Sequence, residues 1–235
     1  MKMANIFITG DCHGGIDAQK LGASVFKEGK NLTKNDYVII AGDFGFPWFD
    51  EQHNAYAQER YWLKWIHDKP WTTLFVDGNH ENFDKLNAYQ QYEWNGGYIH
   101  KITDSIYHLM RGYIFTIHDN TFFTFGGGTS IDKNHRIEGL SWWKEEIPNY
   151  QQYEQGLTTL DNVGWNVDYV ITHTAPSLIH TMIGNHYNQD SLTMYLEEIR
   201  MNLTYKTWFC GHYHIDKVFD VYNVHALYNY KYQIV

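Results

Sequence analysis

The sequence predicts an α/β protein in which two mixed β-sheets pack together and are flanked by helices. Three observations support this fold class. Strand and helix patterns alternate in the first third of the chain, four strand patterns follow one another in the middle, and the last part is rich in strands. Alternation favours parallel pairing, whereas successive strands joined by short turns favour antiparallel pairing. Both kinds together give mixed sheets.

The first third of the chain contains five predicted elements. They are strands at residues 4–9, Tyr37–Ala41 and 71–76, and helices at residues 17–27 and 51–68. Tyr37–Ala41 is a continuous apolar run, as expected for a parallel strand that is buried on both faces. The second helix has an apolar side that includes Trp62 and Ile66, and it ends before Pro70.

The remainder of the chain predicts an antiparallel meander, two helices and a strand-rich end. The meander strands are residues 98–102, 106–110, 113–118 and 121–125. The helices are residues 149–161 and 190–203, on either side of a strand at Tyr169–Thr172, and the final strands are residues 207–210, 217–221, 222–227 and 230–234. Turn signals such as Arg111-Gly112 and Asp119-Asn120 separate the meander strands.

The chain is long enough to bury one substantial core, and it shows neither an internal repeat nor a linker. We therefore expect a single domain over residues 1–235. Residues 126–148 form a long irregular segment that opens with Gly126-Gly127-Gly128. Because such segments in a compact domain are more often functional than not, we expect an active-site loop there.

Composition restricts the class of partner. The net charge is −9 and Lys and Arg do not cluster, which disfavours extended nucleic acid. No apolar run approaches the roughly 18–20 residues of a membrane span, and Asp11 and His13 are incompatible with a signal peptide. Cys12 and Cys210 do not make a disulfide framework. We expect a cytoplasmic protein that acts on a small molecule; its oligomeric state stays open.

Five short apolar runs each end in a turn that carries Asp, Asn or His. The turns are Gly10-Asp11-Cys12-His13-Gly14, Gly42-Asp43, Gly78-Asn79-His80-Glu81, His173 and Gly211-His212-Tyr213-His214. The carboxyl ends of parallel strands lie at one edge of a sheet, where ligands gather. Alternate residues of an extended segment also point the same way, so Asp11 and His13 can reach one ion. The sequence therefore predicts a metal site at this edge.

Seven side chains form the candidate ligand set: Asp11, His13, Asp43, Asn79, His173, His212 and His214. Mixed oxygen and nitrogen donors without a required thiolate suit Mn²⁺, Fe or Zn²⁺ better than Ca²⁺. Asp43 could bridge two ions through its two carboxylate oxygens. Two ions about 3.5–4 Å apart would hold a bridging water, lower its pKa and clamp a phosphoryl group.

His80 stands beside Asn79 but points elsewhere, so it could protonate the leaving oxygen or hold the phosphoryl group. Glu81 allows two interpretations: it orients His80, or it caps the helix that follows. Both residues are candidate catalytic residues.

In order along the chain, the motifs GDCHG, GDFG, GNHE, a lone His after a strand, and GHYH resemble the signature of calcineurin-like metallophosphoesterases. The resemblance covers residues 10–214. It implies a four-layer β-sandwich of two mixed sheets with flanking helices. It assigns a first metal to Asp11, His13, Asp43 and His214, and a second to Asp43, Asn79, His173 and His212. His80 matches the catalytic histidine of the family.

Departures from the motifs narrow the subfamily to small bacterial or phage-type members. In Ser/Thr protein phosphatases the second motif continues with a further Asp and an Arg, where this chain has Phe46 and Pro47. An Arg also precedes the third motif in those enzymes, where this chain has Asp77. The protein phosphatase branch is therefore disfavoured, and the diadenosine tetraphosphatase branch is weakened on the same ground.

Three residues of the 126–148 loop are candidate substrate contacts. Arg136 could grip phosphate with a bidentate guanidinium, or it could be a solvated loop residue. Trp142 and Trp143 could form a stacking wall for a base or an aromatic ester, or they could anchor the loop.

The leading functional hypothesis is a dinuclear metal-dependent phosphoesterase that acts on a small phosphorylated compound, either a monoester or a diester. In it a metal-bridging hydroxide attacks and His80 serves as the acid. The second hypothesis is a nucleotide phosphodiesterase or nuclease, for which the acidic charge argues against long nucleic acid but not against a nucleotide. The third is a non-catalytic, metal-binding interaction scaffold. Such a protein typically loses the catalytic His or several ligands, all of which are present here.

Overall fold

The computed structural model describes residues 5–184 and 189–234. The first of its two sheets is mixed and has seven strands. Its strands, in spatial order, are β13 (Tyr232–Ile234), β1 (Ile6–Thr9), β2 (Tyr37–Ala41), β3 (Thr72–Val76), β6 (Ile106–Leu109), β5 (Gly97–Thr103) and β4 (Gln91–Trp94). The four strands β1, β2, β3 and β6 run parallel, and the pairs β13–β1, β6–β5 and β5–β4 are antiparallel. Ala4, the predicted start of the first strand, lies outside the described residues.

A six-stranded mixed sheet packs against the first. Its strands, in spatial order, are β11 (Lys217–Phe219), β12 (Val224–Ala226), β10 (Thr207–Cys210), β9 (Tyr169–Thr172), β8 (Asn120–Phe125) and β7 (Tyr113–Ile117). The central strands β8, β9, β10 and β12 are parallel. The predicted fold class, two mixed sheets flanked by helices, is confirmed.

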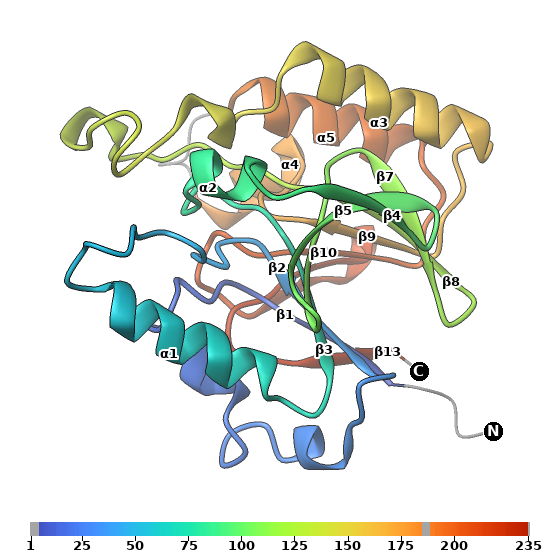
Figure 1. Ribbon diagram of the computed structural model, residues 1–235. Coiled ribbons are helices and arrows are strands. Elements are labelled where there is room, and N and C mark those ends of the chain that lie inside the picture. The colour runs from blue at the N-terminus through green and yellow to red at the C-terminus, as the bar shows by residue number, and fades with distance from the viewer. Residues whose placement is uncertain (1–4, 185–188, 235) are drawn as a thin grey trace.

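Helices cover the outer face of each sheet, which gives four layers (Figure 1). Helix α1 (Tyr56–His67) lies against the first sheet, and α3 (Tyr150–Asn162), α4 (Ser177–Ile183) and α5 (Ser191–Asn202) lie on the side of the second. Successive residues of β2 follow this layering. Val38 packs in the cluster that contains Ile66 of α1, whereas Ile39 packs between the two sheets with Phe209. Alternate side chains of a strand point to opposite faces, so a continuous apolar strand serves two cores.

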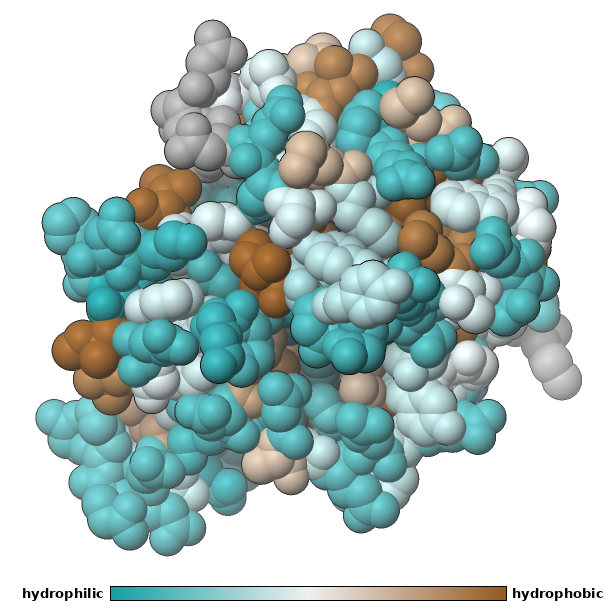
Figure 2. Space-filling view, turned by 90° about the horizontal axis from the view of Figure 1, so that it is seen from above, coloured by the Kyte–Doolittle hydropathy of each residue, from teal (hydrophilic) through white to brown (hydrophobic). Residues whose placement is uncertain are grey.

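The outer surface over α3 and α5 is mostly polar (Figure 2). Figure 2, which views the molecule from above, shows hydrophobic residues scattered among hydrophilic ones on that face. In the described part of the chain, no helix has both the length and the apolar character needed to cross a bilayer.

The predicted four-stranded meander is wrong. The hairpin of β5 and β6 belongs to the first sheet, whereas the hairpin of β7 and β8 belongs to the second. The chain crosses between sheets at Arg111-Gly112, where Gly112 has a φ of +80°. Turn chemistry predicts that the chain reverses there, but it does not specify with which strand the next segment pairs.

The predicted helix at residues 17–27 is also wrong. The chain forms two short 3₁₀ turns, Ala18–Leu21 and Glu28–Asn31, and Gly22 is extended between them. Lys20 is buried and donates a hydrogen bond to the carbonyl of Gly10 at 2.9 Å, so it fixes this segment against the end of β1. Three short elements escaped prediction: α2 (Phe83–Asn87), α4 and β4. They are too short to show a clear period.

Asp36 links the start of β1 to the loop before β2 through four hydrogen bonds. Its Oδ1 accepts hydrogen bonds from the backbone and side-chain nitrogens of Asn5, at 2.6 and 2.8 Å. Its Oδ2 accepts two more from the backbone nitrogen and the hydroxyl of Thr33, at 2.6 and 2.9 Å. Burial alone would raise the pKa of Asp36, but these hydrogen bonds to the ionised form outweigh it and hold the pKa below its ordinary value.

Replacement of Asp36 by asparagine should lower the free energy of unfolding by about 1–2 kcal/mol near neutral pH. The carboxylate contributes stability above its unfolded pKa of about 4, and this contribution is lost as the pH falls through the lower pKa of the folded state. The difference between wild type and Asp36→Asn should therefore shrink in acid. Urea unfolding from pH 7 to pH 3 measures it, and a difference that stays constant over this range would contradict the role of the charge.

Candidate metal centre

The five predicted turns lie at the carboxyl ends of β1, β2, β3, β9 and β10, so both sheets contribute to one site. The structure brings together all seven candidate ligands, with His80 beside them. Four of the seven have a positive φ: His13 (44°), Asp43 (47°), His212 (69°) and His214 (52°). The left-handed backbone turns these side chains back toward the edge of the sheets.

The first group of donor atoms surrounds Asp11 and His13. The Nε2 atom of His214 lies 3.3 Å from Oδ2 of Asp11, and Nε2 of His13 lies 3.1 Å from Oδ2 of Asp43. Single donor atoms of Asp11, His13 and His214 all lie within 4.8 Å of one another. Donor atoms at this spacing could share one ion.

The second group surrounds His173. Its Nε2 atom lies 3.1 Å from Oδ1 of Asn79, 3.3 Å from Oδ1 of Asp43 and 3.2 Å from Nδ1 of His212. Asp43 therefore directs Oδ2 to the first group and Oδ1 to the second. His80 also approaches, because its ring nitrogen comes within 4.8 Å of donor atoms of His13 and Asp43. The seven candidate side chains fall into two sets that share Asp43, and their division between two ions stays a prediction.

The rings of two histidines are held so that one nitrogen faces the site. Nδ1 of His173 donates to the carbonyl of Ala41 at 2.9 Å, so Nε2 is the nitrogen that faces the site. Nδ1 of His13 lies 2.7 Å from Oδ2 of Asp17. A metal-binding histidine usually donates its other N–H to a carbonyl or carboxylate, which fixes the ring and raises its basicity. The donor set and these contacts both fit a metal centre.

The carboxylate of Asp43 lies at the middle of the site and is 1% exposed. Burial would raise its pKa, but His173 and His13 outweigh burial and hold the pKa of this carboxyl well below its ordinary value. Burial together with His173 lowers the pKa of His212 to about 3. The centre therefore presents an ionised carboxylate at Asp43 and a neutral imidazole at His212, the protonation states in which these groups bind metal. Burial would lower the pKa of His173, but Asp43 and Asp11 outweigh it and raise this pKa to about 9, so His173 has to lose a proton when it binds metal.

His80 lies between the ligand groups and the 126–148 loop. Its backbone N–H donates to Oδ1 of Asp43 at 2.7 Å, and its ring lies 5.2 Å from that of His13, centroid to centroid. Nη1 and Nη2 of Arg136 lie 3.3 Å from Nδ1 and Nε2 of His80. Burial lowers the pKa of His80; Asp43 opposes this and Arg136 adds to it. Arg136 also lines a cavity of about 230 Å³ with Asp43, His80 and His214. This placement matches the phosphate-contact interpretation of Arg136.

Glu81 has neither of the two roles considered for it. Asn82 caps helix α2, since its side chain accepts a hydrogen bond from the backbone of Lys85. The carboxylate oxygens of Glu81 instead accept hydrogen bonds from the backbone nitrogens of Phe44 and Gly45, at 2.8 and 3.0 Å. Burial, then Asp43 and Asp77, raise its pKa well above the ordinary value. Glu81 thus supports the turn that carries Asp43 and does not contact the reacting groups.

Trp142 and Trp143 line neither the cavity of the ligand groups nor the larger one beside it. Trp143 is 3% exposed, its Nε1 donates to Asp84 at 2.8 Å, and its ring meets that of Trp48 edge-on at 5.3 Å. The contacts of Trp143 therefore support the loop-anchor interpretation. Trp142 is half-buried, with the ammonium of Lys133 6.0 Å from its ring centre.

At two positions next to the candidate ligands, there is no room for a side chain and only glycine fits. A Cβ atom on Gly78 would lie 2.1 Å from Oδ1 of Asp43, and one on Gly211 would lie 2.1 Å from Oδ1 of Asp11. At these positions the side chain is absent so that a carboxylate can lie directly against the backbone.

Sequence reasoning missed the residues that hold the ligands. The amide nitrogen of Asn79 donates to the hydroxyl of Ser130, which itself donates to Glu146 at 2.7 Å, so Oδ1 of Asn79 faces His173. Tyr228 stacks on His214 at 4.9 Å, and its hydroxyl donates to Asp17. Asp17 follows His13 by four residues, a spacing that could have indicated the pair. Ser130 and Tyr228 carry no such signal.

Comparison with known proteins agrees with this geometry. No curated protein matches the chain. The family model for calcineurin-like phosphoesterases matches residues 4–216, which include all five turns and the 126–148 loop. The chain therefore belongs to the calcineurin-like phosphoesterase family and is a metal-dependent hydrolase of phosphoesters.

Proposed function

We propose that the protein hydrolyses a small phosphorylated compound, a monoester or a diester, at a centre of two metal ions, with His80 as the catalytic acid. One observation carries the proposal: the seven ligand side chains form two groups that share Asp43, and His80 lies at their common border. Asp11, His13, Asp43 and His214 would hold one ion, and Asp43, Asn79, His173 and His212 the other. Mn, Fe and Zn suit these donors best.

When bound, the ions supply positive charge against the phosphoryl oxygens and lower the pKa of the attacking water. The chain itself supplies the groups that handle the ester. Arg136 offers guanidinium N–H groups at the border of the cavity, where they can donate to a phosphoryl oxygen. A negatively charged phosphoryl group next to His80 favours the protonated imidazole, which can then donate its proton to the leaving oxygen.

The proposal restricts the kind of partner and the location. The net charge of −9 and the small cavity favour a compact phosphorylated molecule over extended nucleic acid. Cys12 and Cys210 are both buried free thiols, which is typical of a reducing compartment, and we propose a cytoplasmic location.

Activity should require metal and His80. We expect Mn²⁺-loaded protein to hydrolyse p-nitrophenyl phosphate or bis-p-nitrophenyl phosphate, to lose activity in EDTA, and to regain it when Mn²⁺ is restored. His80→Ala should lower kcat by about 10²- to 10⁴-fold on the preferred ester, because general acid catalysis contributes that much. Initial rates on both esters measure the effect, and the exposed His53→Ala serves as the matched control.

Each outcome decides a different part of the proposal. Preference for the diester would exclude a monoesterase. Equal rates for wild type and His80→Ala would remove the role of His80. Metal-loaded protein that hydrolyses neither ester would leave the interaction scaffold as the better interpretation.

A further inference from the structure

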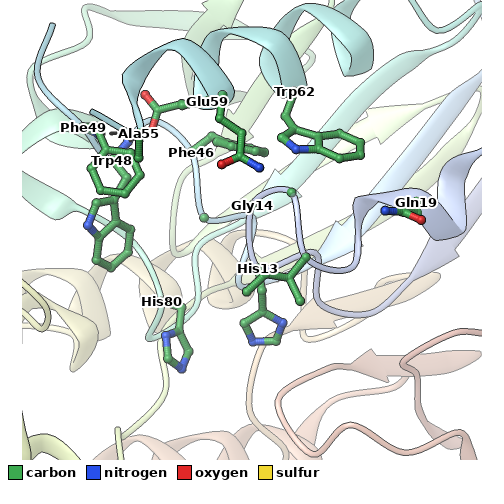
Figure 3. A pocket seen from close by; sticks show the side chains of 14 residues that line it. His13, Gly14, Gln19, Phe46, Trp48, Phe49, Ala55, Glu59, Trp62 and His80 are labelled. Carbon is green, nitrogen blue, oxygen red and sulfur yellow. Dashed lines mark hydrogen bonds between the residues drawn. The ribbon is translucent and has the colours of Figure 1, made fainter. Parts of the chain in front are cut away.

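A second, larger cavity opens beside the metal centre. Its volume is about 570 Å³, within the usual range for small-molecule sites. Its walls come from four segments: the segment after β1, the loop after β2, helix α1 with the residue before it, and His80 after β3. In Figure 3, Trp48 and Trp62 lie on opposite sides of the cavity with Phe46 between them, and His13 and His80 lie along one end.

This cavity adjoins the site of the reaction. His80 lines both the 570 Å³ cavity and the smaller cavity that contains Arg136 and the ligand groups. In the proposed function, His80 donates a proton to the leaving oxygen. The alcohol group that departs must therefore lie on the His80 side of the phosphorus, and this is the side on which the larger cavity opens.

The walls of the cavity are aromatic, and its two histidines lie at the end next to the metal centre (Figure 3). Phe46, Trp48, Phe49 and Trp62 contribute rings, and neither Lys nor Arg is among the described residues that line it. The one carboxylate, Glu59, uses Oε2 to accept hydrogen bonds from the backbone nitrogens of Trp48 and Phe49, at 2.7 and 3.1 Å. An anionic group among these rings would meet this charge without a Lys or Arg to offset it. Flat uncharged rings, in contrast, gain stacking and apolar burial against such walls.

Two carboxamides add polar edges to the aromatic walls. Gln19 and Gln58 line the cavity and are exposed, so they can donate to or accept from polar atoms on the rim of a ring. We propose that this cavity binds the alcohol part of the substrate, and that this part is a flat, uncharged aromatic group. The inference rests on the proposed function, since it places that group by the position of His80.

Filling the cavity tests the inference. Ala55 lines it and is half-buried, whereas Ala57, two residues along α1, is exposed and lies outside it. We expect Ala55→Trp to lower kcat/KM for 1-naphthyl phosphate about 10- to 50-fold, mainly through KM, because lost apolar burial weakens ground-state and transition-state binding alike. Methyl phosphate, whose alcohol is too small to reach the walls, should keep its kcat/KM. Ala57→Trp should leave kcat/KM unchanged for both substrates.

A binding measurement separates the cavity from the chemistry. Titration calorimetry should detect 1-naphthol binding to the wild type and to Ala57→Trp, and at least tenfold weaker binding to Ala55→Trp. Gln58→Phe fills the same cavity from an exposed helical position, so it replaces Ala55→Trp if that variant does not fold.

The outcomes separate the two levels of the proposal. If the filling variants reduce naphthyl and methyl phosphate hydrolysis equally, or reduce neither, the inference is overturned while the phosphoesterase function stands. If the wild type hydrolyses neither these monoesters nor bis-p-nitrophenyl phosphate, the proposed function fails, and the inference fails with it.

Discussion

Asp43→Asn is expected to lower kcat/KM for a phosphoester by about 10³-fold, which corresponds to about 4 kcal/mol of transition-state stabilisation. Asp43 is the residue that both ligand groups share, with Oδ2 3.1 Å from His13 and Oδ1 3.3 Å from His173. Asparagine has nearly the same shape and tolerates the positive φ of this position, so the fold should be retained. The loss therefore reports the missing charge and the missing second carboxylate oxygen.

The control is Asp50→Asn, the same change at an exposed carboxylate of the loop that follows β2. Initial rates and the metal content after dialysis should both fall in Asp43→Asn and stay at wild-type values in Asp50→Asn. If Asp43→Asn kept its full metal content and lost less than tenfold in kcat/KM, a bridging role for Asp43 would be excluded.

Arg111→Met is expected to destabilise the folded protein by about 3–5 kcal/mol, because it leaves a buried carboxylate without its partner. Arg111 and Asp77 are 5% and 1% exposed. The Nε of Arg111 donates to Asp77 at 2.8 Å, and its Nη2 donates to Asp77 and to the carbonyl of Glu145 in the 126–148 loop. Burial would raise the pKa of Asp77, but Arg111 and then His108 outweigh it and lower the pKa.

Urea unfolding of three variants tests this ion pair. Arg60→Met removes an exposed arginine of α1 and should change the free energy of unfolding by less than about 0.5 kcal/mol. The double variant Asp77→Leu with Arg111→Met removes both charges and should recover part of the loss, since a buried pair can be replaced by apolar groups at little cost. If Arg111→Met alone lowered the free energy of unfolding by less than about 1 kcal/mol, water would have to reach Asp77.

The positions of the ligands could be predicted from sequence because each depends on local structure. A buried strand followed by a turn determines where Asp43 and Asn79 stand, and the edge rule for parallel strands brings them together. Sheet membership could not be predicted, because it depends on pairing between distant segments. Ile106–Leu109 pairs with β3 and Tyr113–Ile117 with β8, although only a short turn separates the two strands.

The supporting contacts and the second cavity were beyond prediction for the same reason. Ser130 reaches Asn79 across 51 positions of sequence, and Asp77 meets Arg111 across 34. The aromatic walls combine Phe46 with Trp62 of α1, and no local pattern predicts that these two residues line one cavity. The hypothesis that Trp142 and Trp143 contact the substrate rested on residue type alone. Trp48, which does line the cavity, meets Trp143 edge-on and lies in the loop after β2.

The left-handed backbone at four of the ligands implies a trade-off between activity and robustness. For a residue with a Cβ this conformation costs roughly 1–2 kcal/mol, and glycine would remove most of that cost. Selection for a durable fold alone would favour glycine at His13, Asp43, His212 and His214. Aspartate and histidine occupy them instead. A descendant of this chain that no longer needed the reaction would therefore be free to become more stable by losing its metal ligands first.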